Sequence, residues 1–329
     1  MSEAGPDEVG SDEPDEDAPG EEAFEHRPVM VAEVVELFGP APAGPIVDGT
    51  VGGGGHAEAL LEAHHHIHIV GLDRDATALA AAERTLRRFG ERVVLRHAPF
   101  ERMTEICEEL GHDWVSGVLL DLGVSSPQLD RAERGFSYSA AGPLDMRMDR
   151  SQATTAADVV NHYPEPRLAR VLAELGDERF AGRIARAIVA ARPLRSTAEL
   201  AEVIRAAIPA PARRRGGHPA RRSFQAIRIE VNRELEVLPG ALDAAVELLT
   251  PGGRAVVLAY HSGEDRIVKA RFATAATGGC VCPPGLPCAC GAQPRVRLLR
   301  RGTRPSAAEV AANHRAESAR LRAVERLAS

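Results

Sequence analysis

Residues 49–56, GTVGGGGH, combine five glycines with a histidine, and two aspartates, Asp73 and Asp121, follow later in the chain. Glycines let a ligand approach the backbone closely, and the free amides at the start of a helix bind polar or anionic groups. A carboxylate about 20 residues after such a loop can accept hydrogen bonds from a ribose. These residues predict a site for a nucleoside-containing cofactor, and a tight turn without a ligand is the alternative.

The loop pattern leaves the identity of that cofactor open. Gly52, Gly54 and Ala57 satisfy the G-x-G-x-x-A pattern of dinucleotide-binding proteins. Enzymes that use NAD and enzymes that use S-adenosylmethionine share both this loop and the acidic residue after it. Asp73 is available for such a role, because Asp75 is better placed to cap the helix that follows.

Asp121 lies in LLDLGVSSPQLD (119–130), at the end of an apolar stretch. Ligands in open α/β sheets bind at the carboxyl ends of the strands, so a polar residue there is a candidate for chemistry. A carboxylate can accept the N–H groups of an exocyclic amine and localise its lone pair for attack on a methyl group. Positioning dominates such an in-line transfer. A turn residue is the alternative role for Asp121.

Four of the five cysteines form two C-x-C pairs, at positions 280, 282, 288 and 290. Four thiolates so close in sequence are able to hold a tetrahedral zinc ion. A reduced or partly oxidised loop is equally compatible with this spacing, so the sequence assigns no metal. Cys107, alone in a helical pattern, is expected in the core.

The elements that must position these residues alternate regularly through the first part of the chain. Strands are predicted within 44–50, 66–75, 91–100 and 115–127, and helices within 26–39, 56–64, 76–90 and 103–111. This alternation predicts an α/β fold, with a parallel sheet covered by helices on both faces.

The alternation stops after the fourth strand. Helical patterns follow over 164–193 and 196–209, then a loop with five arginines over 213–222, and then a long helical stretch over 226–249 that we expect Pro239-Gly240 to interrupt. The predicted organisation is a disordered acidic segment (1–25), an α/β domain in two parts (26–128 and 226–329), and an inserted helical domain (129–225).

The charge of the chain is unevenly distributed. Residues 1–25 hold eleven Asp or Glu and no Lys or Arg, so the net charge of −7 conceals a body with 40 basic and 36 acidic residues. An arginine-rich, mildly basic body suits an anionic partner. No apolar run approaches the roughly 18 residues that span a bilayer. Because there is also no signal-peptide pattern, we expect a cytoplasmic protein without a membrane partner.

Several sequence blocks resemble one known family. They are HRPVM (26–30), DGTVGGGGHA (48–57), GLDRD (71–75), LLDLGVSSPQLD (119–130), RGFSY (134–138), PLDMRMD (143–149), FQAIRIEVNREL (224–235), AYHSGEDRIVK (259–269) and SARLRA (318–323). Together they resemble the bacterial 16S ribosomal RNA cytosine-N4 methyltransferases. The resemblance implies a Rossmann-like S-adenosylmethionine-dependent methyltransferase fold with an inserted helical domain. It also implies methyl transfer to the exocyclic N4 of a cytosine in 16S ribosomal RNA of the small ribosomal subunit.

The resemblance also implies roles for particular residues. Cofactor contacts are implied at Gly54, Gly55, His56, Asp73, Phe100, Asp121 and Gln128, of which Asp121 is also the candidate catalytic residue. The candidates for the substrate pocket are Arg134, Phe136, Asp145 and Arg147. SSPQ lacks the second proline and the aromatic residue of the general amino-methyltransferase signature. Phe136 or Tyr138 is therefore the candidate for stacking on the target base.

Two other functions compete with this one. A nicotinamide-dependent oxidoreductase would use the same glycine loop, but the insert offers no Lys or Tyr pair as a hydride-transfer acid. A non-catalytic RNA-binding assembly factor would keep the fold without the cofactor. The intact Gly54, Gly55, His56 and Asp73 argue against that loss. The sequence gives no prediction of oligomeric state.

Overall fold

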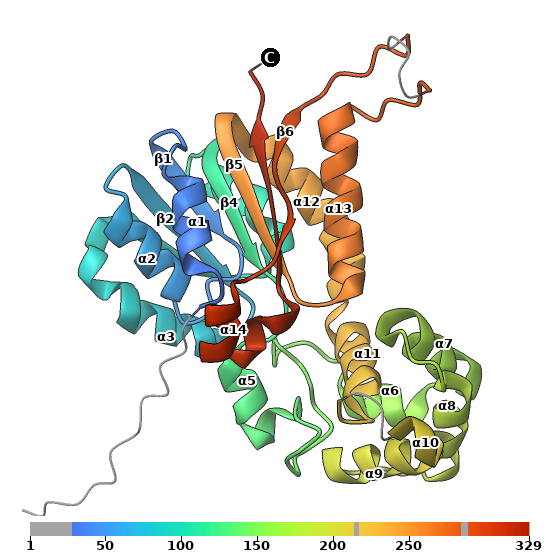
Figure 1. Cartoon of the computed structure of the whole chain (residues 1–329). Coiled ribbons are helices and arrows are strands. Elements are labelled where there is room, and N and C mark those ends of the chain that lie inside the picture. Colours follow the sequence, from blue (N-terminus) through green and yellow to red (C-terminus); the bar gives the residue numbers. More distant parts are fainter. Residues whose placement is uncertain (1–27, 214–216, 284–288, 329) are drawn as a thin grey trace, which may run out of the picture.

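The computed structural model describes residues 28–213, 217–283 and 289–328, and a seven-stranded sheet forms its centre (Figure 1). The strands are β1 (Gly44–Asp48), β2 (Ile67–Asp73), β3 (Val93–His97), β4 (Val115–Asp121), β5 (Leu249–Ala259), β6 (Val296–Thr303) and β7 (Arg320–Arg326). Their order in the sheet is β3-β2-β1-β4-β5-β7-β6. Strands β1 to β5 pair in parallel, and β7 runs antiparallel to both β5 and β6. The segment predicted to be disordered, 1–25, lies outside the described residues.

Helices cover both faces of this sheet, as the alternation predicted. One face carries α1 (Val31–Phe38), α2 (Gly55–Ala63) and α3 (Ala76–Leu86), and the other carries α4 (Met103–Glu109), α12 (Glu234–Leu248) and α13 (Ser262–Thr277). Each face has its own apolar cluster, in which side chains such as Phe38 and Phe272 are almost completely buried. Two further helices, α5 (Ser126–Asp130) and α14 (Ala307–Ala312), lie near the lower end of the sheet in Figure 1. The predicted α/β architecture is confirmed, and β1 to β5 form the predicted parallel sheet, which β7 and β6 extend with antiparallel pairing.

A second group of helices lies below the carboxyl ends of the strands in Figure 1. Its members are α6 (Ala156–His162), α7 (Glu165–Gly176), α8 (Ala181–Ala190), α9 (Thr197–Ala207), α10 (Ala210–Arg213) and α11 (Arg221–Asn232). These helices enclose a separate apolar cluster that extends from Phe136 to Val231. Helix α9 begins where the sequence indicated, because the Ser196 hydroxyl accepts a hydrogen bond from the amide of Glu199. The boundary proposed at residue 225 lies within α11, which continues to Asn232.

The predicted interruption at Pro239-Gly240 is wrong. Helix α12 runs through Pro239 without a break, and the chain instead turns at Arg233, whose φ of 52° lies in the left-handed region. Proline removes one hydrogen bond from a helix, and here burial of Leu238 and Leu242 against the sheet offsets that cost. The turn at Arg233 is held from outside the helices, because the Asn232 side chain bonds the backbone of Met146 and Met148.

Within the described ranges, no helix is both long enough and apolar enough to cross a membrane.

Candidate active site

Three adjacent strands of the sheet end on aspartates. Asp48 ends β1, Asp73 ends β2 and Asp121 ends β4. In the strand register Asp48 lies level with Gly71 and Leu119, so Asp73 and Asp121 each extend two residues further. Since β1 continues to β2 on one side while β4 lies on the other, the three carboxyl groups surround a topological switch point. Ligands bind at such points in open α/β sheets.

The Asp73 side chain fixes the backbone of the glycine loop by hydrogen bonding. Its two carboxylate oxygens accept hydrogen bonds from the amides of Gly52 (2.9 Å) and Asp75 (2.8 Å). Burial raises the pKa of Asp73, while these two amide hydrogen bonds act in the opposite direction. Asp75 caps α3 by accepting from the amide of Thr77, as the sequence predicted, which leaves Asp73 for another role.

Asp48 is a member of this group that the sequence did not single out. It is buried beneath the other two carboxyl groups, and its Oδ1 accepts from the amide of Thr50 (3.2 Å). Burial, together with the negative charges of Asp121 and Asp73, raises the pKa of Asp48 from 3.8 to about 8. The only sequence signal was an acidic residue at the end of the apolar strand in GPIVD. At neutral pH this carboxyl group is therefore largely protonated.

We expect Asp48→Asn to change how stability depends on pH. Because folding raises the pKa of Asp48, its contribution to stability is fully present below about pH 4 and is lost as pH rises towards about 8. Over that window the free energy of unfolding falls by about 1.4 kcal/mol per pH unit from this group. Urea unfolding of both proteins at several pH values measures the effect. The variant should gain stability relative to the natural chain as pH rises, and a difference independent of pH would contradict the assignment.

The glycines of the loop serve different purposes. A side chain on Gly49 would collide with Leu120, one on Gly55 would lie 2.4 Å from the Pro28 ring, and Gly54 has a φ of +89°. These three are required by the packing or conformation of the chain itself. Gly53 is different, because it is exposed, has no positive φ, and a side chain there would meet no atom within 4 Å. The space beside Gly53 is the part of the loop open to a ligand.

This difference yields a paired prediction. Gly53→Ala should leave the free energy of unfolding within about 0.5 kcal/mol of the natural value, as at an ordinary surface position. The added methyl group of Gly53→Ala should hinder contact between the cofactor and the backbone at residue 53. We therefore expect the cofactor to bind about tenfold more weakly, a loss of about 1.4 kcal/mol. Gly55→Ala should instead destabilise the fold by about 1–3 kcal/mol, because Pro28 must move. Thermal unfolding and calorimetric titration of both variants separate the effects, and unchanged affinity in Gly53→Ala would remove that residue from the site.

Asp121 is held in place by residues from three other segments of the chain. The Tyr260 hydroxyl donates to Asp121 Oδ1 (2.6 Å), and Nδ1 of His56 lies 3.6 Å from Oδ2. His56 is buried at the start of α2, and its Nε2 donates to the carbonyl of Val29 (2.9 Å) because a carbonyl can only accept. The backbone amide of Asp121 donates to the Thr50 hydroxyl (2.6 Å). The structure therefore brings together two predicted site residues, His56 from the start of α2 and Asp121 from the end of β4.

Tyr260 was quoted within AYHSGEDRIVK but was given no role from the sequence. Burial and the neighbouring Asp121 carboxylate raise the pKa of Tyr260 well above its usual value, so its hydroxyl stays protonated and donates. The Tyr260 backbone is fixed by Glu264, which is buried at the start of α13 and accepts from the amides of Tyr260 and His261. Tyr260 is thus one of the residues that orient the Asp121 carboxylate.

Phe100 follows β3 and lies at the base of the glycine loop. It is 9% exposed, and its Cβ would be only 2.9 Å from a side chain at Gly49. The Arg74 guanidinium lies 5.7 Å from the centre of its ring. The structure thus places Phe100 near the end of β1, where the predicted cofactor site lies, while much of its ring packs in the core.

Gln128 and Arg134 both bond to Asp75. The Gln128 amide donates to Asp75 Oδ2 (2.9 Å), and the Arg134 guanidinium donates to the same oxygen (2.7 Å). Arg134 is buried and also donates to the carbonyls of Arg147 and Met148. Burial would raise the pKa of Asp75, but the hydrogen bonds from Gln128 and Arg134 and the positive charge of Arg134 lower it. These contacts favour a structural role for Arg134 over the substrate contact expected from the sequence.

The other substrate candidates divide between core and surface. Phe136 is 5% exposed and belongs to the apolar cluster of the helical part, so its ring is not available for stacking on a base in this structure. Tyr138 is partly exposed and stacks on His218, with ring centres 4.5 Å apart. Asp145 and Arg147 form a bidentate ion pair with N–O distances of 2.8 and 2.9 Å. Tyr138 therefore remains as the candidate for base stacking.

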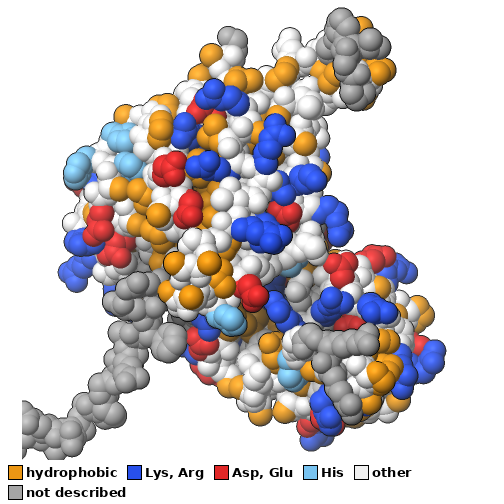
Figure 2. Space-filling view, in the orientation of Figure 1, with side chains coloured by type: hydrophobic (Ala, Val, Ile, Leu, Met, Phe, Trp, Pro, Cys, Tyr) orange, Lys and Arg blue, Asp and Glu red, His pale blue; other side chains and the backbone are white. Residues whose placement is uncertain are grey.

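The predicted basic loop is described only in part, because residues 214–216 lie outside the described ranges. Arg221 and Arg222 are exposed at the start of α11, and Arg213 donates to the carbonyl of Ile208. Figure 2 shows basic side chains on both the sheet part and the helical part of this face, interspersed with acidic ones. The described surface therefore offers several separate contact points for an anion.

Comparison with known proteins identifies the family. The chain is 56% identical over 309 residues to the ribosomal RNA small subunit methyltransferase H of Thermobifida fusca, which covers 92% of this chain and 93% of that protein. The protein of the same name from Renibacterium salmoninarum is 51% identical over 319 residues, covering 93% and 96%. A solved rRNA methylase from Streptococcus thermophilus aligns with 90% of this chain and 95% of its own, at 11% identity and a TM-score of 0.41, too weak a likeness to support an argument. The MraW methylase family matches residues 23–327, and the chain therefore belongs to that family.

Proposed function

We propose that this protein transfers a methyl group from S-adenosylmethionine to the exocyclic N4 of a cytosine in 16S ribosomal RNA of the small ribosomal subunit. Membership of a methylase family supports the reaction type, and the names of the relatives support a ribosomal RNA substrate. The observation that carries the proposal is the position of Asp121. It lies at the end of β4, held by Tyr260 and close to His56, next to the strand that leads into the glycine loop.

The residues around the loop fit S-adenosylmethionine. Asp73 accepts two backbone amides, and each carboxylate oxygen keeps a second lone pair that would accept a ribose hydroxyl. The exposed backbone at Gly53 would lie against the methionine part, and the edge of Phe100 would contact the adenine. Gly54 and Gly55 shape this loop, and Gln128 supports the neighbouring α3 through Asp75. The acidic groups at the strand ends also suit a ligand with a positive charge.

The chain's own residues would act mainly by positioning the amine. When bound, S-adenosylmethionine supplies an electrophilic methyl group on a positively charged sulfur. The Asp121 carboxylate would accept an N–H of the cytosine amine, which draws the lone pair of N4 out of the ring and towards the methyl group. The same carboxylate would accept the proton that N4 releases after transfer. Tyr260 keeps the carboxylate fixed, so that little reorganisation is needed during the reaction.

The target base must leave its stack to reach Asp121, because the exocyclic amine of a paired cytosine is not accessible. Tyr138, already stacked on His218, would provide an aromatic surface for it. The exposed Arg221 and Arg222 would contact phosphates, which adds affinity without sequence choice. Since ribosomal subunits are cytoplasmic, we also propose a cytoplasmic location.

Calorimetric titration and nucleoside analysis test this function. S-Adenosylmethionine and its demethylated product should bind with micromolar dissociation constants, about −8 kcal/mol, while NAD should not bind. The purified protein should then form N4-methylcytidine, detected by mass spectrometry, on 16S RNA or on isolated small subunits. Binding of NAD would favour the oxidoreductase, and binding of neither cofactor would favour a non-catalytic assembly factor. Methylation on a different atom or a different RNA would contradict the substrate.

A further inference from the structure

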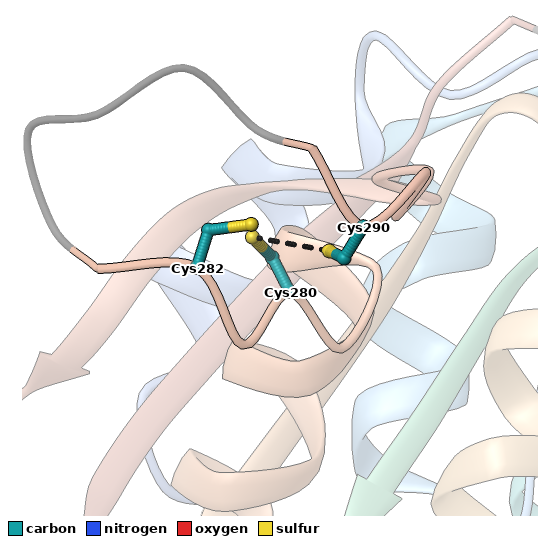
Figure 3. Close-up of side chains that lie close together, drawn as sticks. All are labelled: Cys280, Cys282 and Cys290. Carbon is teal, nitrogen blue, oxygen red and sulfur yellow. Dashed lines mark hydrogen bonds between the residues drawn. The ribbon is translucent and has the colours of Figure 1, made fainter.

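Three cysteines come together in the segment between α13 and β6. Figure 3 shows Cys280, Cys282 and Cys290 with their sulfur atoms directed towards one another. The three sulfur atoms all lie within 4.8 Å of one another, and those of Cys280 and Cys290 are 3.6 Å apart. The fourth cysteine of the sequence motif, Cys288, lies outside the described residues and is not part of this set.

The backbone at the base of the segment is built to bring its two ends together. Gly278 ends α13 with a φ of +63°, and a side chain there would lie 2.4 Å from the backbone of Gln293. The amide of Arg295 donates to the carbonyl of Ala275, which joins the start of β6 to the end of the helix. This close approach holds Cys280 and Cys290 near each other although they are ten positions apart in the sequence.

Burial of apolar side chains does not explain why these three cysteines lie close together in defined positions. Within the described part of this segment, Val281 is 86% exposed, Ala289 and Cys290 are exposed, and Cys280 and Cys282 are only partly buried. A short segment that projects from the body in this way has too little apolar surface to form a core of its own. In such segments a metal ion or a disulfide commonly replaces the missing core.

The distances favour a metal ion over a disulfide. Zinc binds thiolate sulfur at about 2.3 Å in a tetrahedron, which places ligand sulfurs roughly 3.8 Å apart. The 3.6 Å between Cys280 and Cys290 is close to that spacing and far from the roughly 2.0 Å of a disulfide bond. The amide of Ala289 also donates to the sulfur of Cys282 (3.3 Å), which stabilises negative charge on a thiolate ligand.

We propose that Cys280, Cys282 and Cys290 bind one zinc ion as thiolates, with a fourth ligand from outside this set. Sulfur ligands in a tetrahedral arrangement select zinc over harder ions such as magnesium or calcium. The spacing of the cysteines in the sequence assigned no metal. The short distances between the sulfur atoms show that the three side chains are close enough to bind one ion.

The role of this site is structural. The cysteines precede β6, which runs in the same direction as β5, so they lie at the amino-terminal edge of the parallel strands. Asp48, Asp73 and Asp121 lie at the opposite edge. Zinc would fix the connection between α13 and β6 without touching the reacting groups.

Metal analysis of the full chain tests the proposal directly. The protein is expressed without a histidine tag, purified in a reducing buffer without chelator, and measured by plasma mass spectrometry. About one zinc per chain is expected, and the double variant Cys280→Ser/Cys290→Ser should lose at least about nine-tenths of it. Cys107→Ala is the matched control, because that cysteine is buried on α4 and should not affect zinc content. Cobalt substitution should add an absorption band characteristic of thiolate ligands in the natural chain and not in the double variant.

Several outcomes would overturn the inference. These are absence of zinc together with free reactive thiols, a Cys280–Cys290 disulfide in the reduced preparation, or zinc retained in the double variant. The double variant should keep binding S-adenosylmethionine with natural affinity, so the result does not depend on the proposed reaction. A folded double variant, verified by circular dichroism, ensures that a loss of zinc reports on the ligands.

Discussion

Asp121→Asn should reduce the turnover number by about 100- to 1,000-fold, about 2.7–4 kcal/mol of transition-state stabilisation. The amide keeps the size of the side chain and can still accept from Tyr260, but it carries no negative charge and cannot take up the proton released by the amine. The affinity for S-adenosylmethionine should fall much less than the turnover number, because the proposed role of Asp121 is mainly towards the amine. Single-turnover methylation of 16S RNA with saturating cofactor measures the effect.

Tyr260→Phe provides the comparison for this variant. Loss of the Tyr260 hydroxyl removes a hydrogen bond that orients Asp121 but leaves the carboxylate in place. We therefore expect a smaller fall in turnover, about tenfold, which corresponds to about 1.4 kcal/mol. If Asp121→Asn retained near-natural turnover, Asp121 would not be a catalytic residue. A larger loss in Tyr260→Phe than in Asp121→Asn would mean that the hydroxyl itself acts on the substrate.

Asp73→Ala should weaken the binding of S-adenosylmethionine by about 100-fold, or about 2.7 kcal/mol. The variant removes the acceptor proposed for the ribose and also leaves the amides of Gly52 and Asp75 without their partner. Turnover at saturating cofactor should fall much less than the apparent affinity. Calorimetric titration measures the dissociation constants, and methylation assays at varied cofactor concentration measure the Michaelis constant.

A second ligand and a control variant test whether Asp73 binds the ribose. S-Adenosylmethionine and its demethylated product share the ribose, so both should lose affinity by the same factor. If only the charged cofactor lost affinity, Asp73 would act on the sulfonium and not on the ribose. Glu83→Ala, which removes an exposed carboxylate on α3, should leave both affinities unchanged.

Much of the sheet could be predicted from the sequence because each of its first four strands is short, apolar and followed by a clear helix signal. The same patterns placed Asp73 and Asp121 at strand ends and identified Asp75 as a cap. Burial of Asp48 depends instead on the register of β1 between β2 and β4, which is a property of the assembled sheet. A local pattern does not contain this information.

The site contacts that the sequence did not predict join distant segments of the chain. Arg134 bonds Asp75 across 59 positions, and Tyr260 bonds Asp121 across 139. Likewise, the turn at Arg233 replaces the expected break at Pro239 because Asn232 is held by the backbone of the segment around residue 147. Helix propensity cannot anticipate a turn that tertiary contacts impose.

The bond between Arg134 and Asp75 also links the energetics of the two halves of the molecule. Arg134 lies in the segment that leads to the helical part, whereas Asp75 caps α3, a helix that packs on the sheet. Removing Arg134 would leave the Asp75 carboxylate buried without its cation, and the loss of one partner from such a buried pair costs about 3–5 kcal/mol. We therefore expect the helical part and the sheet to be coupled in stability, so that a substitution which displaces Arg134 also destabilises the start of α3.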